Sequence, residues 1–220
     1  MVLKGKVMNK QNRWRWFIFL SGLVVQAFGI NLNTKTGFGV SPIAGIAYTV
    51  TGVTGISFGI TTFVMYLIFI FLQFVILGRN FKPVQLLQIV VALISSYFVN
   101  LFNIVVPDLI SMPSRVIGLV LAIVITAMGI IMTVPMKLIP NPADALTNAM
   151  ATKMKGNLGL AKNIFDFSCM SVSVVIALLS VHHLIGIGIG TIMSMLFTGR
   201  AVALLEPVRR KLVQVAGTRN

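Results

Sequence analysis

Apolar residues fall into eight runs along the chain, separated by short polar segments that are rich in Gly and Pro. Six of the runs have about the 20 residues that a helix needs to cross a bilayer. They cover approximately residues 14–32, 56–77, 83–106, 116–134, 158–181 and 185–205. The other two runs, 41–53 and 143–154, are too short to span and are predicted to be short or re-entrant helices. Because backbone polar groups in lipid need partners within the protein, we expect every spanning run to be helical.

The composition supports a membrane protein. Of the 220 residues, 57% are hydrophobic and only 10% are charged, whereas roughly 25% are charged in soluble domains. This composition excludes a soluble enzyme and a disordered chain, and a single cysteine excludes a disulfide scaffold. We predict an all-α, polytopic helix bundle that forms one membrane domain over residues 1–220. It has six transmembrane helices, two short half-helices and a basic tail at each end.

The basic residues predict an orientation. The 18 Lys and Arg residues gather at the ends of apolar runs, which favours a role in membrane orientation over nucleic-acid binding. With the N-terminus inside and six crossings, Arg79, Lys82 and Lys153 lie inside, whereas Lys35 and Asp108 lie outside. The positive-inside rule then makes both termini cytoplasmic. Run 14–32 is followed by no cleavage site and is expected to be retained, and the lack of an Asn-x-Ser/Thr sequon fits a bacterial cytoplasmic membrane.

The chain also repeats itself with an offset of 100 residues. This offset places Gly29 on Gly129, Pro42 on Pro142 and Gly59 on Gly159. Matches of Gly and Pro weigh more than apolar matches, because each fixes a backbone feature. Each half, about 14–106 and about 114–208, contains three crossings and one short helix. An odd number of crossings gives the halves opposite orientations, so the sequence predicts an inverted-topology repeat, which is typical of secondary transporters.

A polar break precedes the short helix in both halves, and the two breaks supply the candidate binding site. Pro42 and Pro142 suit the first helical position, and Ser41 and Asn141 can cap the helices. Broken backbone at membrane depth is buried in protein or lines a cavity, and free N–H groups at a helix start favour an anion. We predict that the two starts meet across the pseudo-twofold axis and border a central cavity for a small solute. The predicted substrate-binding residues are Asn31, Asn33, Ser41, Pro42, Asn141, Pro142, Asp144 and Asp166.

Two parts of this hypothesis have alternatives. The breaks can instead be elbows in opposite headgroup regions, far apart and without a ligand. Asp166 is the one acidic residue within a predicted span, and we expect it to face the interior and pair, because a charge facing lipid is costly. If Lys162, one turn earlier, lies at the inner membrane edge, Asp166 is only shallow. The glutamines of the spans, Gln26, Gln73 and Gln88, are expected to form interhelical hydrogen bonds.

Other motif-like strings have structural explanations. Residues 55–59 match the pattern G-x-S-x-G, and Ser57 lies on the same predicted side as His182 and His183, which suggests an intramembrane serine hydrolase. The repeat explains the same string as a duplicated helix start, because Asn157 takes the position of Ser57. The glycines of 186–190 lack the spacing of a dinucleotide loop and are interpreted as close helix packing. No metal-ligand spacing and no Walker A string occurs, so we expect no metal, no cofactor and no enzymatic activity.

The glycines and prolines form a further pattern. Residues 37–42 read Gly-Phe-Gly-Val-Ser-Pro, residues 55–59 follow, and the second half contains Gly-Ile-Gly-Thr at 188–191 and Phe-Thr-Gly at 197–199. Over about residues 14–208 these strings resemble the YczE/YyaS/YitT family of bacterial membrane proteins. That family usually has Pro after the last glycine, where this chain has Arg200. The resemblance implies an integral cytoplasmic-membrane protein and gives no substrate or catalytic residue.

These features favour a carrier or permease-like protein for an unidentified small solute. Three other classes stay open: a solute-binding membrane subunit that works with a partner ATPase, a non-transporting membrane scaffold or regulator, and the hydrolase around Ser57. The expected partners are the lipid bilayer, the solute, and either an ATPase or further copies of the chain. Nucleic acid is not an expected partner.

Overall fold

The computed structural model describes residues 10–217, and within this range it contains helices and no strand. The predicted all-α fold is therefore confirmed for the described residues. The first half of the chain forms α1 (Lys10–Lys35), α2 (Pro42–Thr54), α3 (Phe58–Leu77) and α4 (Gln88–Val105). The second half forms α5 (Met112–Thr133), α6 (Pro142–Lys153), α7 (Leu158–Val181), α8 (Ile189–Leu204) and α9 (Glu206–Ala216). Short 3-10 turns at Gly78–Asn80, Pro83–Leu87 and Val134–Met136 adjoin α3, α4 and α5.

Several of these helices are long and apolar enough to cross a membrane. α1 and α7 meet both criteria, as do α3, α4 and α5 together with the 3-10 turns that adjoin them. α8 has only 16 residues, and it makes a sixth span only together with α9, which is bent from it by 58°. The sixth predicted run begins at residue 185, but α8 begins at Ile189, because Gly186 has a positive φ of 70° that a right-handed helix does not accept. The structure thus supports a multi-pass membrane protein with five or six spans.

The helix starts of the two halves repeat with the same 100-residue offset as the glycines and prolines. α2 and α6 begin at Pro42 and Pro142, and α3 and α7 begin at Phe58 and Leu158. Proline suits a first helical position, because its fixed φ matches the helix and no helical hydrogen bond needs its missing N–H. Each of these four helices follows a Ser or Asn at the cap position, where these residue types are favoured. The same local signals therefore start the same elements twice.

Helices α1 and α5 cross almost backbone to backbone. A Cβ atom added at Gly29 would lie 2.7 Å from the backbone nitrogen of Thr126. One added at Gly129 would lie 2.7 Å from the backbone nitrogen of Gln26. Cβ atoms in proteins do not approach so closely, so only glycine fits at either position without a shift of the backbone. The two contacts are reciprocal, because Gln26 and Thr126 are themselves 100 residues apart.

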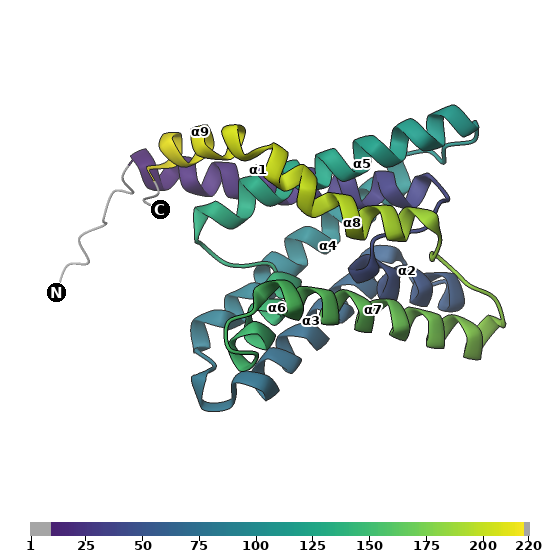
Figure 1. Cartoon of the computed structure of the whole chain (residues 1–220), viewed down its shortest axis with the longest axis horizontal. Coiled ribbons are helices and arrows are strands. Elements are labelled where there is room, and N and C mark those ends of the chain that lie inside the picture. Colours follow the sequence, from purple (N-terminus) through teal and green to yellow (C-terminus); the bar gives the residue numbers. More distant parts are fainter. Residues whose placement is uncertain (1–9, 218–220) are drawn as a thin grey trace.

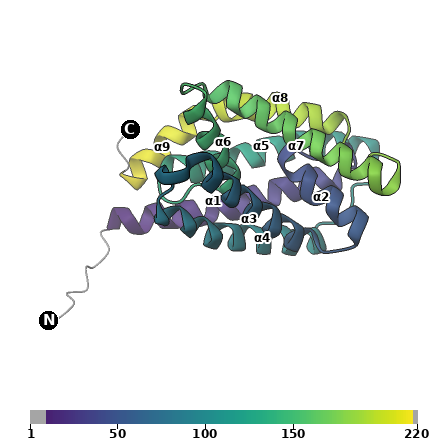
Figure 2. The same cartoon turned by 90° about the horizontal axis from the view of Figure 1, so that it is seen from below.

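The other helices pack around this crossing. α4 lies against α1 and α3, α8 lies against α5, and α2 and α6 each pack between longer helices (Figure 1). Seen from below, α3 and α4 run along one side of the bundle, with α7 and α8 along the other (Figure 2). The main buried cluster joins large side chains of α3 to small ones of the short helices, among them Phe58, Met65, Ala47 and Ala143. The core therefore lies where the short helices meet the long ones.

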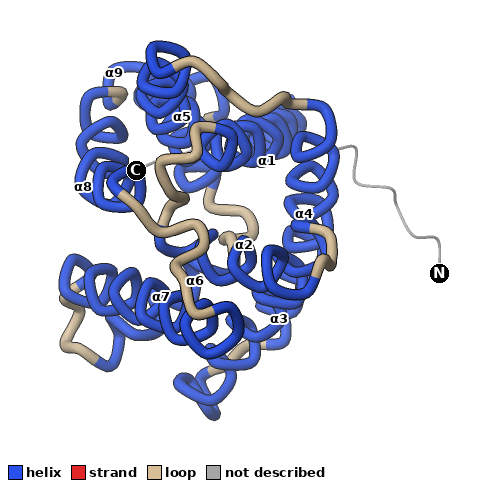
Figure 3. Tube along the Cα trace, turned by 90° about the vertical axis from the view of Figure 1, so that its right-hand side faces the viewer, coloured by secondary structure: helices blue, strands red, loops and turns tan. Residues whose placement is uncertain are grey.

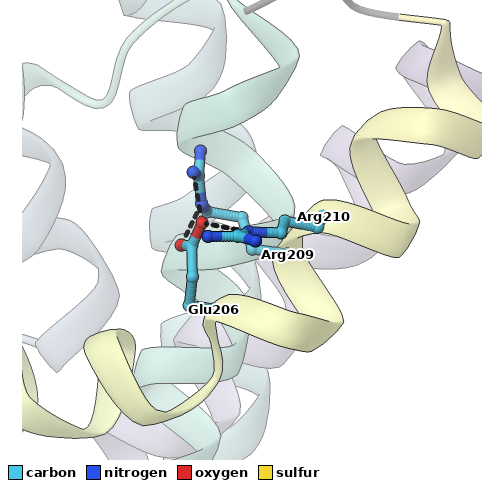
Figure 4. Close-up of polar contacts among 3 residues, drawn as sticks. All are labelled: Glu206, Arg209 and Arg210. Atoms are coloured by element: carbon cyan, nitrogen blue, oxygen red, sulfur yellow. Dashed lines mark hydrogen bonds and ion pairs between the residues drawn. The ribbon is translucent and has the colours of Figure 1, made fainter.

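Helix α9 returns the end of the described chain to the beginning of α1. Leu212 and Ala216 of α9 belong to a cluster with apolar residues of the first half of α1. At the bend, the carboxylate of Glu206 accepts hydrogen bonds from Arg209 at 2.5 and 2.7 Å and from Arg210 at 3.1 Å (Figure 4). Exposed ion pairs contribute little to stability, so we attribute the attachment of α9 to its apolar contacts. Both ends of the described chain lie on one side of the molecule (Figure 1).

The crossing of α1 and α5 makes a prediction about stability. The substitution Gly129→Ala should destabilise the protein by about 1–3 kcal/mol, because the added methyl group overlaps the α1 backbone. Gly199→Ala in α8 is the matched control, since nothing lies within 4 Å of a Cβ atom added there. Alanine is the better helix former by about 1 kcal/mol, so the control should be neutral or stabilising. Thermal unfolding of the purified variants in detergent measures both effects, and equal behaviour of the two variants would contradict the close crossing.

Candidate functional site

A cavity of about 460 Å³ lies at the centre of the bundle, and each of the helices α1 to α8 contributes to its wall. One part of the wall is apolar, with Phe58, Met65 and Val99 among its residues. Another part carries charged and polar side chains from α6 and α7. A cavity of this size, with a few polar groups that converge in a mostly apolar wall, is typical of a site for a small molecule.

The structure brings five of the eight predicted binding residues to this cavity. They are Ser41, Pro42, Asn141, Asp144 and Asp166. Residues at the starts of both short helices therefore contribute to the wall of one cavity. That these residues bind a solute stays a prediction.

The start of α6 is held by a buried pair of glutamines. The side-chain amides of Gln73 in α3 and Gln88 in α4 donate to each other at 3.1 and 3.0 Å. The Gln73 amide also donates to the backbone carbonyl of Pro142 at 3.1 Å. Asn141 caps the helix, because its side chain accepts from the backbone N–H of Ala143 at 3.0 Å. Pro142, a predicted binding residue, is thus a buried attachment point for α6.

The start of α2 is held by the backbone at the beginning of α8. The N–H of Val40 donates to the carbonyl of Gly186 at 2.8 Å, and the N–H of Gly190 donates to the carbonyl of Phe38 at 2.7 Å. The segment before α2 and the segment before α8 approach so closely that a Cβ atom added at Gly39 would lie 2.5 Å from the backbone nitrogen of Gly188. This contact supports the interpretation of the 186–190 glycines as packing residues. The side chain of Ser41 forms no capping hydrogen bond, so it satisfies none of the backbone N–H groups in the first turn of α2.

Asn31 and Asn33 lie behind the cavity wall and do not belong to it. The side chain of Asn31 donates to the carbonyls of Ala27 and Val99, both at 3.0 Å, and so joins α1 to α4. The side chain of Asn33 donates to the hydroxyl of Ser194 at 2.7 Å and joins α1 to α8. Both asparagines are buried, with 0% and 5% of their surfaces exposed. Their interhelical hydrogen bonds place them behind Ser41, Asn141 and Asp144, and their contact with a solute stays a prediction.

Three charged side chains line the cavity. Lys162 and Asp166 of α7 form an ion pair in which the lysine side chain is 42% exposed and the carboxylate 8%. Asp166 therefore faces the interior, as expected from the cost of a carboxylate in lipid. Asp144 lies in the first turn of α6, and no ion pair involves it among the residues that the structure describes. The three groups carry a formal charge of −1 together.

A second cavity of about 310 Å³ adjoins the first and shares part of its wall. Asn141 and Asp144 line both spaces, and the rest of the second wall comes from α1, the segment after α5, and α6, with Phe19 and Lys137 among its residues. The start of α6 thus forms the partition between the two cavities.

Some residues of the wall were not predicted from the sequence. Tyr66, Asn163, Ser194 and Thr198 line the central cavity. Ser and Thr are common at helix contacts in membranes, so their type carries no signal for a site. Asn163 did offer a signal, because it is an amide within a predicted span and follows Lys162 directly.

Ser57 occupies the cap position of α3, as the duplicated helix start predicts. His182 follows the last residue of α7, and His183 contacts the carbonyl of Val181. Within residues 10–217, no hydrogen bond connects Ser57 to either histidine. Ser57 thus has no base paired with it in this geometry, and the hydrolase alternative stays a prediction.

Residues 13–207 match DUF6198, a family of unknown function. The match covers most of the chain, and the chain belongs to this family. Comparisons with curated proteins and with solved structures give no match.

The glutamine pair makes a prediction that separates its role from simple packing. Gln73→Leu or Gln88→Leu alone leaves one buried amide without its partner, and each should cost about 1–3 kcal/mol of stability. The double variant removes both amides and should be less destabilised than the sum of the single variants. A double-mutant cycle from thermal unfolding in detergent measures the coupling. Strict additivity would show that the two amides do not act as a pair.

Proposed function

We propose that this DUF6198 protein is a carrier or permease-like protein that moves a small solute across a bacterial cytoplasmic membrane. The observation that carries the proposal is the meeting of two short-helix starts, one from each half, at one cavity that contains Asp144, Lys162 and Asp166. Secondary transporters bind their substrates at such breaks between repeats. A scaffold or regulator has no need of a polar cavity inside its bundle, and we therefore favour transport.

The inverted-topology repeat is part of this proposal, and the packing of the helices supports it. α1 packs on α4 as α5 packs on α8, and α2 packs on α3 as α6 packs on α7. Each short helix also packs on the other half, α2 on α7 and α6 on α3. Such an exchange of partners is expected of two halves related by a twofold axis. The reciprocal contacts of Gly29 with Thr126 and of Gly129 with Gln26 are of the same kind.

The charge of the cavity favours a solute with a positive group. The positive end of α6, which the sequence suggests for an anion, already has the carboxylate of Asp144 in its first turn. Lys162 is paired with Asp166, so Asp144 is the carboxylate left for a partner. We therefore propose an amine or another small cation, with an apolar part that contacts Phe58 and Met65.

The membrane location and orientation also belong to the proposal. The described ends of the chain lie together, and the basic turn between α3 and α4 lies toward the same side of the molecule (Figure 1). This arrangement supports cytoplasmic termini by the positive-inside rule. The resemblance to the YczE/YyaS/YitT family stays a prediction and agrees with the same location.

Cysteine accessibility tests the orientation. On a Cys169→Ser background, Arg79→Cys and Lys153→Cys should react with a membrane-impermeant maleimide only after the cells are permeabilised. Asp108→Cys, on the opposite side, should react in intact cells and serves as the control. Labelling of position 79 in intact cells would reject the topology and the inverted repeat together.

Ligand-dependent stabilisation tests the site. A panel of small amines and carboxylates of similar size is compared by thermal shift on the purified protein. At 100 times its dissociation constant, a bound amine should add about 2.7 kcal/mol of stability. Asp144→Asn should lose this gain, whereas Asp108→Asn should keep it, since Asp108 is exposed and paired with Lys35.

The outcomes separate the competing functions. Stabilisation by carboxylates alone would reverse the proposed charge of the solute. Uptake of the stabilising amine by liposomes that contain only this chain is expected of a carrier. Binding without uptake would favour the subunit that depends on a partner ATPase.

A further inference from the structure

The close packing of α3 on α4 has no counterpart between α7 and α8. A Cβ atom added at Gly59 would overlap Asn100 and would lie 2.7 Å from the carbonyl oxygen of Ser96, so α3 and α4 touch. At Gly159, the matching position in α7, an added Cβ atom meets only a side-chain oxygen of Asn157 at 3.8 Å. α8 packs on α5 and lies apart from α7 (Figure 3).

The exposure of α8 differs from that of α4 in the same way. Ala92 and Ser96 of α4 are 0% and 6% exposed, whereas the matching Ile192 and Leu196 of α8 are 56% and 51% exposed. Val99 is buried, and an added Cβ atom at the matching Gly199 has nothing within 4 Å. The uncovered face of α8 is defined by Ile192, Met195, Leu196 and Gly199.

The uncovered face borders an opening of the central cavity. The exposed residues of the cavity wall all lie on α7 or α8, and they are Gly159, Asn163, Met195 and Gly199. The wall residues of α3 and α4 are all buried. The cavity is therefore closed between α3 and α4 and open between α7 and α8. Lipid is an unfavourable neighbour for the exposed amide of Asn163, which needs hydrogen-bond partners.

We propose that the protein has a second state in which α8 packs on α7 as α4 packs on α3. In that state residues 196 and 200 cover Gly159, the uncovered face of α8 is buried and the opening is closed. In the same transition α3 and α4 separate, and the cavity opens between them, on the side of the bundle opposite to α7 and α8. This inference rests on the proposed function, and in particular on its inverted repeat. It gives each half of the chain the helix packing that the other half has in this structure.

The glycines make this exchange physically reasonable. Gly59 is required for the close contact of α3 and α4, because any side chain there would overlap α4. Gly159 has no such neighbour in the present state, so its lack of a side chain has no packing reason in that state. A contact with α8 in a second state supplies the reason. Two packings of comparable free energy would then expose one cavity to each side of the membrane in turn.

Disulfide formation in reconstituted liposomes tests the second state. On a Cys169→Ser background, Asn163→Cys/Leu196→Cys should form an intramolecular disulfide on mild oxidation. The matching Phe63 follows Gly59 by one turn on the same face of α3, and Ser96 touches that face. Gly159 is kept, because a side chain there would prevent the proposed contact. Residues 163 and 196 are both exposed, so these substitutions leave the core unchanged. The positive control is Phe63→Cys/Ser96→Cys. The negative control is Asn163→Cys/Phe197→Cys, because the matching Tyr97 is 63% exposed even with α4 packed on α3.

Each outcome decides the matter. An intramolecular 163–196 disulfide, identified by mass spectrometry, supports the second state. A disulfide-linked dimer would overturn it and show that a second copy covers α8. No 163–196 disulfide, together with a complete 63–96 disulfide, would show that α8 stays against lipid. The test needs no solute, so failure of every amine to bind would reject the proposed solute and leave this result standing.

Discussion

The backbone contact between α1 and α5 is the constraint on which the rest of the structure depends. Gly29 and Gly129 allow these helices to approach until each glycine touches the backbone of the other helix. The approach fixes how the two halves of the chain sit relative to each other. Gln26 and Thr126, the residues that the glycines touch, also line the central cavity. The crossing thus forms one side of the cavity, and the short helices close in from the opposite side.

The second constraint is the hydrogen bonding of the backbone where the helices break. Both halves face the same problem, because each short helix begins inside the bundle. The first half solves it with backbone partners, since Val40 and Phe38 bond to glycines at the start of α8. The second half uses side chains, with Gln73 bonded to the carbonyl of Pro142 and Asn141 as the cap. Equivalent positions therefore have different partners. At the cavity, the side chain of Asn141 caps its helix, whereas the side chain of Ser41 does not.

The sequence predicts the fold where a local signal decides the conformation. Pro42 and Pro142 define the starts of the short helices correctly, because proline acts within its own turn. The sixth run is predicted to begin at residue 185, earlier than α8 does. The apolar pattern continues through Gly186 and contains no sign of the backbone turn at that glycine. Asn31 is a predicted site residue because of its polar break, but hydropathy gives the depth of a residue and not the side of the helix on which it lies. Its bonds to Ala27 and Val99 could be known only from the packing.

The crossing of α1 and α5 also has a consequence for biosynthesis. Its partners are about 100 residues apart, which corresponds to roughly 5–20 s of synthesis at ordinary translation rates. During this interval α1 is already made, while the segment that fills its glycine groove is still on the ribosome. Gly22 and Gly29 must therefore stay uncovered in the membrane, or be shielded by an insertion factor, until α5 arrives. The late arrival of α5 makes assembly of the two halves, rather than formation of single helices, the vulnerable stage in the production of this protein.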